Sequence, residues 1–127
     1  MEIKLTHEES EKIFHNSLCN GHQIAYYGLE LDYSDEEYEN AMQRLIDRDE
    51  SRCLEDVWME MLRGGATLTL VDNENGEEPS VITLADVHER VQTAPVRHLL
   101  DAVNEQDDGD TADVILQTVF YQDVIFG

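Results

Sequence analysis

Positively charged residues are scarce in this sequence. Its 127 residues hold only 8 Lys and Arg against 29 Asp and Glu, which gives a formal net charge of −21 at pH 7. A protein with this charge is repelled by the phosphates of nucleic acid and by anionic membranes, so we expect neither as a direct partner. The charge instead favours a partner with a basic surface.

Long apolar runs, cysteines and interdomain linkers are scarce as well. The longest apolar runs extend over a few residues, so we expect no membrane-spanning helix, and the acidic start MEIKLTHEES lacks the apolar core of a secretory signal. Cys19 and Cys53 are too few for a disulfide framework, which favours a reduced, cytoplasmic protein. Because no repeat and no Pro/Gly/Ser-rich linker divides the chain, we expect residues 1–127 to form a single acidic domain.

Capping patterns predict where helices begin. Three Ser or Thr residues are each followed three positions later by an acidic residue, which is the spacing of a capping box. The predicted helix starts are Thr6, Ser34 and Thr83. We expect the first helix to stop at Asn20-Gly21. A further helix is predicted from Leu54 to Leu62, where apolar residues follow the spacing of a buried helical face.

The C-terminal third is predicted to be helical as well. Pro95 divides its pattern into two short helices, at residues 86–93 and 96–104. Asp110 or Thr111 is expected to cap a final helix with apolar residues on more than one side. Such a helix is either central in the fold or covered by a partner. A homodimer through this C-terminal helix is one form of the second alternative.

Alternating apolar and polar residues predict strands in four places. They are Glu2–Leu5, Ile24–Tyr33, Thr67–Val71 and Ser80–Thr83. The last two flank Asn75-Gly76, a hairpin turn signal. Strands joined by a hairpin, without regular alternation of strand and helix, favour an α+β fold. We therefore expect a small, mostly antiparallel sheet of about four strands, with helices packed mainly on one face.

Acidic residues gather in two patches. The stretch ELDYSDEEYE carries six carboxylates in ten residues, and no Lys or Arg occurs between Ile13 and Gln43. Residues two apart on a strand repeat every ~6.6 Å on one face, and the acids that follow surround the start of a helix, so the sequence predicts an acidic rim. A second patch lies beyond Arg97, the last basic residue. The predicted partner-binding residues are Glu30, Asp32, Asp35, Glu36, Glu37 and Glu39 in the first patch, and Asp107, Asp108 and Asp110 in the second.

The total charge resembles that of DNA of the same length. A globule of this size is about 36 Å across, and duplex DNA carries about 21 phosphates over that length. Acids in the first turn of a helix are favoured by its dipole, which explains some of these residues individually. A salt-adapted composition is another explanation of the total. Local capping alone does not explain 29 acids against 8 bases.

No motif for catalysis or for a cofactor is found in the sequence. His15, Cys19, His22 and Cys53 carry donor atoms that suit zinc, but structural zinc sites have paired short spacings and only one cluster is present. In the acidic stretch at 72–78, Gly76 falls at the wrong position for a calcium loop. We therefore predict no enzyme activity, no metal and no cofactor.

Three arginines, Arg44, Arg48 and Arg52, would share one face of a helix if a single helix runs through them. A basic stripe of this kind suits phosphate binding. Because acidic residues surround these arginines, we expect them to pair within the chain instead.

Three stretches of the chain carry a resemblance to known proteins. LELDYSDEEYE, ITLADVHERVQ and TADVILQTVFYQDVIFG resemble the small acidic proteins encoded by bacteriophages and mobile elements of gut bacteria. The composition is also similar to that of DNA-mimic inhibitors of the antirestriction and anti-CRISPR type. Those inhibitors share no fold or motif, so no residue roles are carried over. The resemblance implies a protein of the bacterial host's cytoplasm.

Two functional hypotheses follow. The first is a non-enzymatic binding protein whose acidic surface occupies the basic nucleic-acid channel of a host defence nuclease. The alternative is a structural or regulatory adaptor that binds a protein through the apolar C-terminal helix, with the acid serving solubility only.

Overall fold

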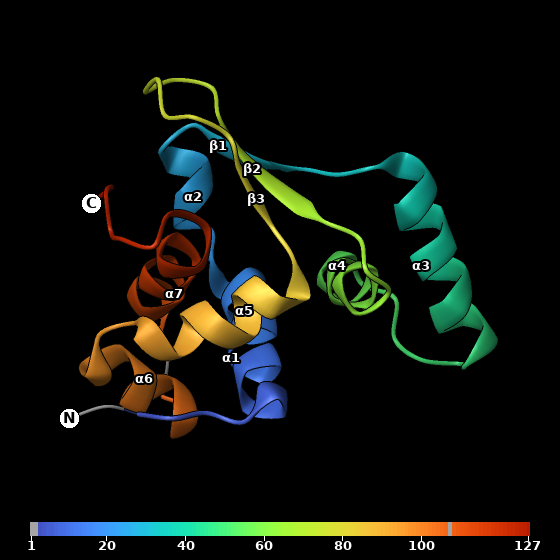
Figure 1. Ribbon diagram of the computed structural model, residues 1–127, viewed down its shortest axis with the longest axis horizontal. Helices are drawn as coiled ribbons and strands as arrows, with labels where there is room; N and C mark the ends of the chain where they lie inside the picture. The colour runs from blue at the N-terminus through green and yellow to red at the C-terminus, as the bar shows by residue number, and fades with distance from the viewer. Residues whose placement is uncertain (1–2, 107) are drawn as a thin grey trace.

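Seven α-helices and a three-stranded antiparallel sheet make up the computed structural model, which describes residues 3–106 and 108–127 (Figure 1). This arrangement confirms the α+β fold class. The elements in chain order are α1 His7–Asn20, α2 Gln23–Tyr26, β1 Leu29–Asp32, α3 Asp35–Asp47, α4 Leu54–Arg63, β2 Leu68–Asp72, β3 Ser80–Ile82, α5 Leu84–Arg90, the 3₁₀ turn η1 Val91–Thr93, α6 Val96–Val103 and α7 Gly109–Tyr121.

The predicted helix starts are confirmed at their caps. The Thr6 hydroxyl accepts the Glu9 N–H at 3.0 Å, and the Glu9 carboxylate accepts the Thr6 N–H at 2.9 Å. α5 begins with the same reciprocal pair at Thr83. At α3, the Ser34 hydroxyl accepts the Glu37 N–H at 3.3 Å. Because each cap satisfies N–H groups that the helix itself leaves unpaired, the local sequence decides where these helices begin.

The cap of α7 differs from the prediction. Asp108 caps this helix, since its Oδ1 accepts the Thr111 N–H at 3.0 Å. Asp110 and Thr111, the predicted caps, lie inside the first turn. An acidic run offers several residues with similar cap propensity, so the sequence pattern alone placed the cap two or three residues too late.

The sheet has the strand order β1-β2-β3, with both neighbouring pairs antiparallel. The hairpin of β2 and β3 is confirmed. The predicted strand at Glu2–Leu5 is not confirmed: Glu2 lies outside the described residues, and Ile3 to Leu5 form no strand. The predicted strand at 24–33 is also shorter than expected, since its first part is the helix α2. Gly28 separates the two with a φ of +80°, a conformation that glycine adopts without strain.

α7 is enclosed by other elements of the fold. It contacts α1, α2, α5, α6, η1 and β3 (Figure 1). Ile115, Leu116, Val119 and Phe120 are all buried by the chain's own elements. Of the two alternatives that the sequence leaves open for this helix, the structure shows the central position. The large apolar side chains left exposed next to it are Val124 and Ile125, at 41% and 40%.

The segment after α7 is held by one buried side chain. Gln117 Oε1 accepts the N–H groups of Ile125 and Phe126, each at 2.8 Å. Its Nε2 donates to Asp113 Oδ1 at 3.0 Å and to the Phe126 carbonyl at 3.1 Å. Gln117 therefore fixes the C-terminal segment against the helix that precedes it.

Replacing Gln117 by leucine should release this segment. The Ile125 and Phe126 N–H groups would lose their acceptor, and we expect unfolding to become easier by about 2 kcal/mol. Hydrogen–deuterium exchange should accelerate at these two amides, whereas the exposed Gln106→Leu control leaves them unchanged. Unaltered exchange in Gln117→Leu would show that other contacts hold the segment.

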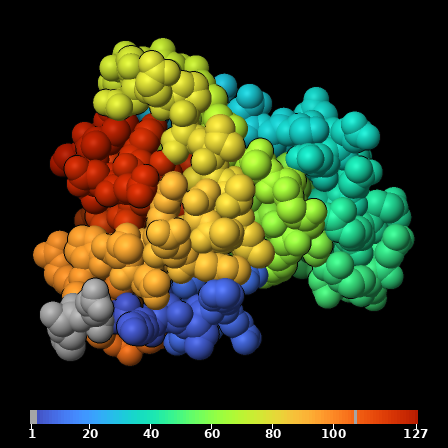
Figure 2. Space-filling view, in the orientation of Figure 1, coloured from blue at the N-terminus to red at the C-terminus, as the bar shows by residue number. Residues whose placement is uncertain are grey.

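α3 lies at one end of the molecule, with α4 between it and the other helices (Figures 1 and 2). Its apolar side, with Ala41 and Leu45 buried, packs on α4. The prediction that helices pack mainly on one face of the sheet is not confirmed, because α3 packs on a helix. None of the helices in residues 3–106 and 108–127 combines the length and apolar character that crossing a membrane requires.

Candidate functional site

The first acidic patch follows the chain from β1 into the first half of α3. We call residues 30–39 the acidic segment. Its six carboxylates are all exposed: Glu30, Asp32, Asp35, Glu36, Glu37 and Glu39. None of them forms an ion pair within the described chain, and the one hydrogen bond to their oxygens is that from the Tyr33 N–H to Asp32 Oδ1, at 3.0 Å. These charges are therefore available to an external cation.

The arginines of the same region point elsewhere. Arg44 Nε donates to Glu60 Oε2 at 3.3 Å and its Nη2 to the Glu60 carbonyl at 3.2 Å. Arg48 binds the other oxygen of Glu60 and also Glu50 Oε2, the latter at 3.1 Å. The predicted pairing within the chain is confirmed for these two arginines. Their partner Glu60 lies on α4, so the basic half of α3 is directed at α4 and leaves the acidic half without countercharge.

The condition for a stripe of three arginines, a single helix through Arg44, Arg48 and Arg52, is not met. α3 ends at Asp47, Arg48 is its C-cap residue, and Asp49 has a φ of +55°. The chain therefore leaves the helical path before Arg52, which is exposed.

Glu60, the carboxylate that joins α4 to the two arginines, is a residue that the sequence reasoning missed. Its side chain is only 7% exposed, and its neighbours on α4 are mostly buried apolar residues. Burial acts to raise the pKa of Glu60, but the hydrogen bonds from Arg48 and Arg44 outweigh it and hold this pKa below its ordinary value. The sequence did contain a sign of this pairing. Glu60 is a carboxylate among the apolar residues of α4, and the preceding helix ends with two arginines.

The Glu60 cluster should make stability depend on acid. A lowered carboxylate pKa stabilises the fold above the unfolded value of about 4.5, and the stabilisation is lost as pH falls through the folded value. Replacing Glu60 by glutamine should lower the free energy of unfolding by about 2 kcal/mol at neutral pH. The loss is smaller than for a fully buried ion pair, because both arginines are about half exposed and water can solvate them. The difference in unfolding free energy between wild type and Glu60→Gln should shrink below pH 4.5. A constant difference down to pH 3 would contradict this role.

Three further basic residues are paired within the chain. Lys12 pairs with Glu105 at 3.1 Å, Arg63 with Glu11 at 2.8 Å, and Arg90 with Asp86 at 3.4 Å. With Arg44 and Arg48, five of the 8 basic residues have internal partners. The negative charge of the acidic segment is thus not neutralised by the chain's own bases.

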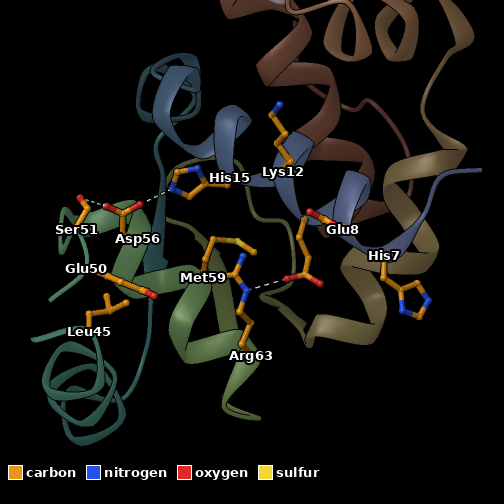
Figure 3. Close-up of a pocket in the computed structure, with 11 residues that line it drawn as sticks. His7, Glu8, Lys12, His15, Leu45, Glu50, Ser51, Asp56, Met59 and Arg63 are labelled. Atoms are coloured by element: carbon orange, nitrogen blue, oxygen red, sulfur yellow. Dashed lines mark hydrogen bonds and ion pairs between the residues drawn. The ribbon is translucent and has the colours of Figure 1, made fainter. Parts of the chain in front are cut away.

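A cleft of about 770 Å³ lies between α1 and α4 and is lined mostly by polar side chains (Figure 3). At one side of the cleft, Asp56 lies between two polar partners: its Oδ1 is 2.7 Å from His15 Nε2, and its Oδ2 accepts the Ser51 hydroxyl at 2.5 Å (Figure 3). An activated serine needs a base such as histidine as its direct neighbour. Here the serine binds the carboxylate instead, so the trio ties α1 to the start of α4.

Donors that the sequence analysis considered for zinc and calcium, and did not predict as sites, also hold local structure. The described residues hold no group of three or more His, Cys, Asp or Glu that could hold a metal. His15 of the considered zinc set is bonded to Asp56. In the 72–78 turn, the Asp72 carboxylate accepts the N–H groups of Glu74, Asn75 and Glu77 at 2.9 to 3.0 Å. Asp72 thereby organises the hairpin turn.

The second acidic patch lies at the N-terminus of α7, beside α2. Asp107 falls outside the described residues. Asp108 is the helix cap, and the Thr111 N–H lowers the pKa of Asp108. Asp110 Oδ1 accepts Gln23 Nε2 at 3.0 Å. Both carboxylates are exposed but also hold local structure, which distinguishes them from those of the acidic segment.

Comparisons with protein-family models, with curated proteins and with solved structures find no match to this chain.

Proposed function

We propose that this chain is a non-enzymatic binding protein that mimics nucleic acid and blocks the basic DNA- or RNA-binding channel of a host defence nuclease. The observation that carries the proposal is the acidic segment: six exposed carboxylates without a basic partner in the described chain. A surface of this kind attracts a basic channel over tens of ångströms at low salt and less at high salt.

The spacing of the carboxylates supports mimicry. Glu30 and Asp32 stand on one face of β1, about 6.6 Å apart along the strand. On α3, Glu36 and Glu39 are three residues apart, which places their Cβ atoms about 5–6 Å from each other on a helix surface. A row of arginines that binds the successive phosphates of a nucleic acid could therefore bind these regularly spaced carboxylates instead. Arginine forms bidentate pairs with carboxylate as it does with phosphate.

A displacement assay tests the proposal. A short fluorescent DNA duplex bound to each of a panel of restriction and CRISPR nucleases reports displacement as a fall in anisotropy. We expect this protein to displace the duplex from at least one of them, and the displacement to weaken strongly between low salt and about 0.5 M salt. Failure to displace the duplex from any of them would refute the proposed function.

The adaptor alternative makes a different prediction. With α7 buried, its apolar contact with a partner would depend on Val124 and Ile125. Replacing both by serine should abolish the interaction if the protein is an adaptor, and should leave it unchanged if the carboxylates bind. A pull-down of the partner with this variant, and with a variant in which Glu30 and Asp32 are replaced by lysine, separates the two functions.

A further inference from the structure

β1 is an edge strand with an unused side. The order β1-β2-β3 leaves no strand beyond β1 among the residues that the structure describes. The Gly28 carbonyl accepts the Asn73 N–H at 2.9 Å, so the hydrogen-bonded pairs with β2 fall at Gly28, Glu30 and Asp32. By this alternation, Leu31 directs its N–H and C=O away from β2, towards the free edge. An exposed strand edge is a template for a further strand.

A largely apolar groove of about 550 Å³ is formed on the buried side of this edge. Leu31 of β1 and Tyr33, the residue that follows β1, line it and face Trp58 of α4 and Ile24 of α2. Tyr26, at the rim, is 86% exposed. A groove with tyrosine and tryptophan walls resembles the hot-spot regions of protein interfaces, where such side chains anchor a partner.

The outer side of the same strand carries negative charge. Glu30 and Asp32 are both exposed and project from the face opposite to Leu31. Neither forms an ion pair in the described chain, and Glu55 adds a carboxylate to the wall of the groove. A strand laid against β1 would therefore meet an apolar environment on one side and carboxylates on the other.

We propose that the free edge of β1 binds an extended segment of the partner protein in which basic and apolar residues alternate. The apolar side chains enter the groove, the basic ones pair with Glu30 and Asp32, and Leu31 supplies the main-chain hydrogen bonds. A second copy of this chain is a poor occupant, because it would bring two sets of these carboxylates side by side. This inference rests on the proposed function and names the part of the nuclease that the acidic segment holds.

Trp58 makes the inference testable, because it is the one tryptophan of the chain and lines the groove. A short peptide of alternating Lys and Val is titrated into the full-length protein, with Trp58 fluorescence as the readout. A block peptide of the same composition, with its lysines and valines separated, is the control. We expect the alternating peptide to bind about tenfold more tightly, and an N-methylated version to lose that advantage.

Two variants locate the binding on the protein. Glu30→Lys combined with Asp32→Lys should weaken binding of the alternating peptide about tenfold, and Glu8→Lys combined with Glu89→Lys, on α1 and α5, should leave it within about twofold. Exchange of the Leu31 amide should slow when the peptide binds.

Equal binding of the alternating and block peptides, or unchanged exchange at Leu31, would overturn the strand-pairing inference. If the protein nevertheless displaces DNA from a nuclease, the proposed function stands without it. If the peptide binds as expected and no DNA is displaced, the edge is a binding site and the nuclease is the wrong partner.

Discussion

A variant in which four carboxylates of the acidic segment are reversed to lysine should bind the proposed partner, a nuclease, about 100-fold more weakly than the wild type. The four are Glu30, Asp32, Glu36 and Glu39. Each reversal replaces an attraction to the basic channel by a repulsion, and all four side chains are exposed. The fold should be retained, since none of these carboxylates pairs with a base in the described chain. Displacement of labelled DNA measures the loss.

A matched control separates the effect of where the negative charge lies from the effect of how much negative charge the protein carries. Four other exposed carboxylates without side-chain hydrogen bonds in the described chain are reversed to lysine, which gives the same net charge. They are Glu8, Glu77, Glu78 and Glu89. We expect this control to lose only several-fold, through the weaker long-range field. Equal losses in the two variants would mean that net charge binds the partner and that the acidic segment has no special role.

Replacing Phe14 by alanine should destabilise the protein by about 4 kcal/mol. Phe14 is fully buried on α1 and packs against Phe120 of α7, with 6.2 Å between the ring centroids. The cavity would lie where the two helices meet at the centre of the core. The midpoint of thermal unfolding should fall by about 15 °C, as measured by circular dichroism.

This core variant is also a control for binding. At a temperature where Phe14→Ala remains folded, it should displace DNA as well as the wild type, because it leaves the carboxylates in place. A loss below about 1 kcal/mol would show that the core closes over the missing ring and that α1 and α7 are less tightly coupled than their packing indicates.

Local signals predicted much of the fold. Thr6, Ser34 and Thr83 mark helix starts because a cap is decided by a few neighbouring residues. The hairpin around Asn75-Gly76 forms for the same reason. The predicted strands at 2–5 and 24–33 failed in whole or in part, since a strand also needs a neighbour to pair with. Only Leu29–Asp32 finds one, in β2.

The exposure of the acidic segment could be predicted from the sequence, whereas the contacts around it could not. The exposure of the acidic segment follows from its sequence, because such a run has little to bury. The pairing of Arg44 and Arg48 with Glu60 joins residues 12 to 16 positions apart and depends on how α3 docks on α4. The groove below β1 gathers Leu31, Trp58 and Ile24 from three elements, so periodicity within any one element could not show it.

The salt dependence of nuclease binding tests the central claim most directly. The affinity of the wild type and of the variant with four reversed carboxylates is measured for one nuclease over a series of salt concentrations. If the acidic segment enters the basic channel, the wild-type affinity falls steeply with salt, and the variant shows weak binding with a much shallower slope. Equal slopes for the two proteins would contradict the claim that these carboxylates are what the partner recognises.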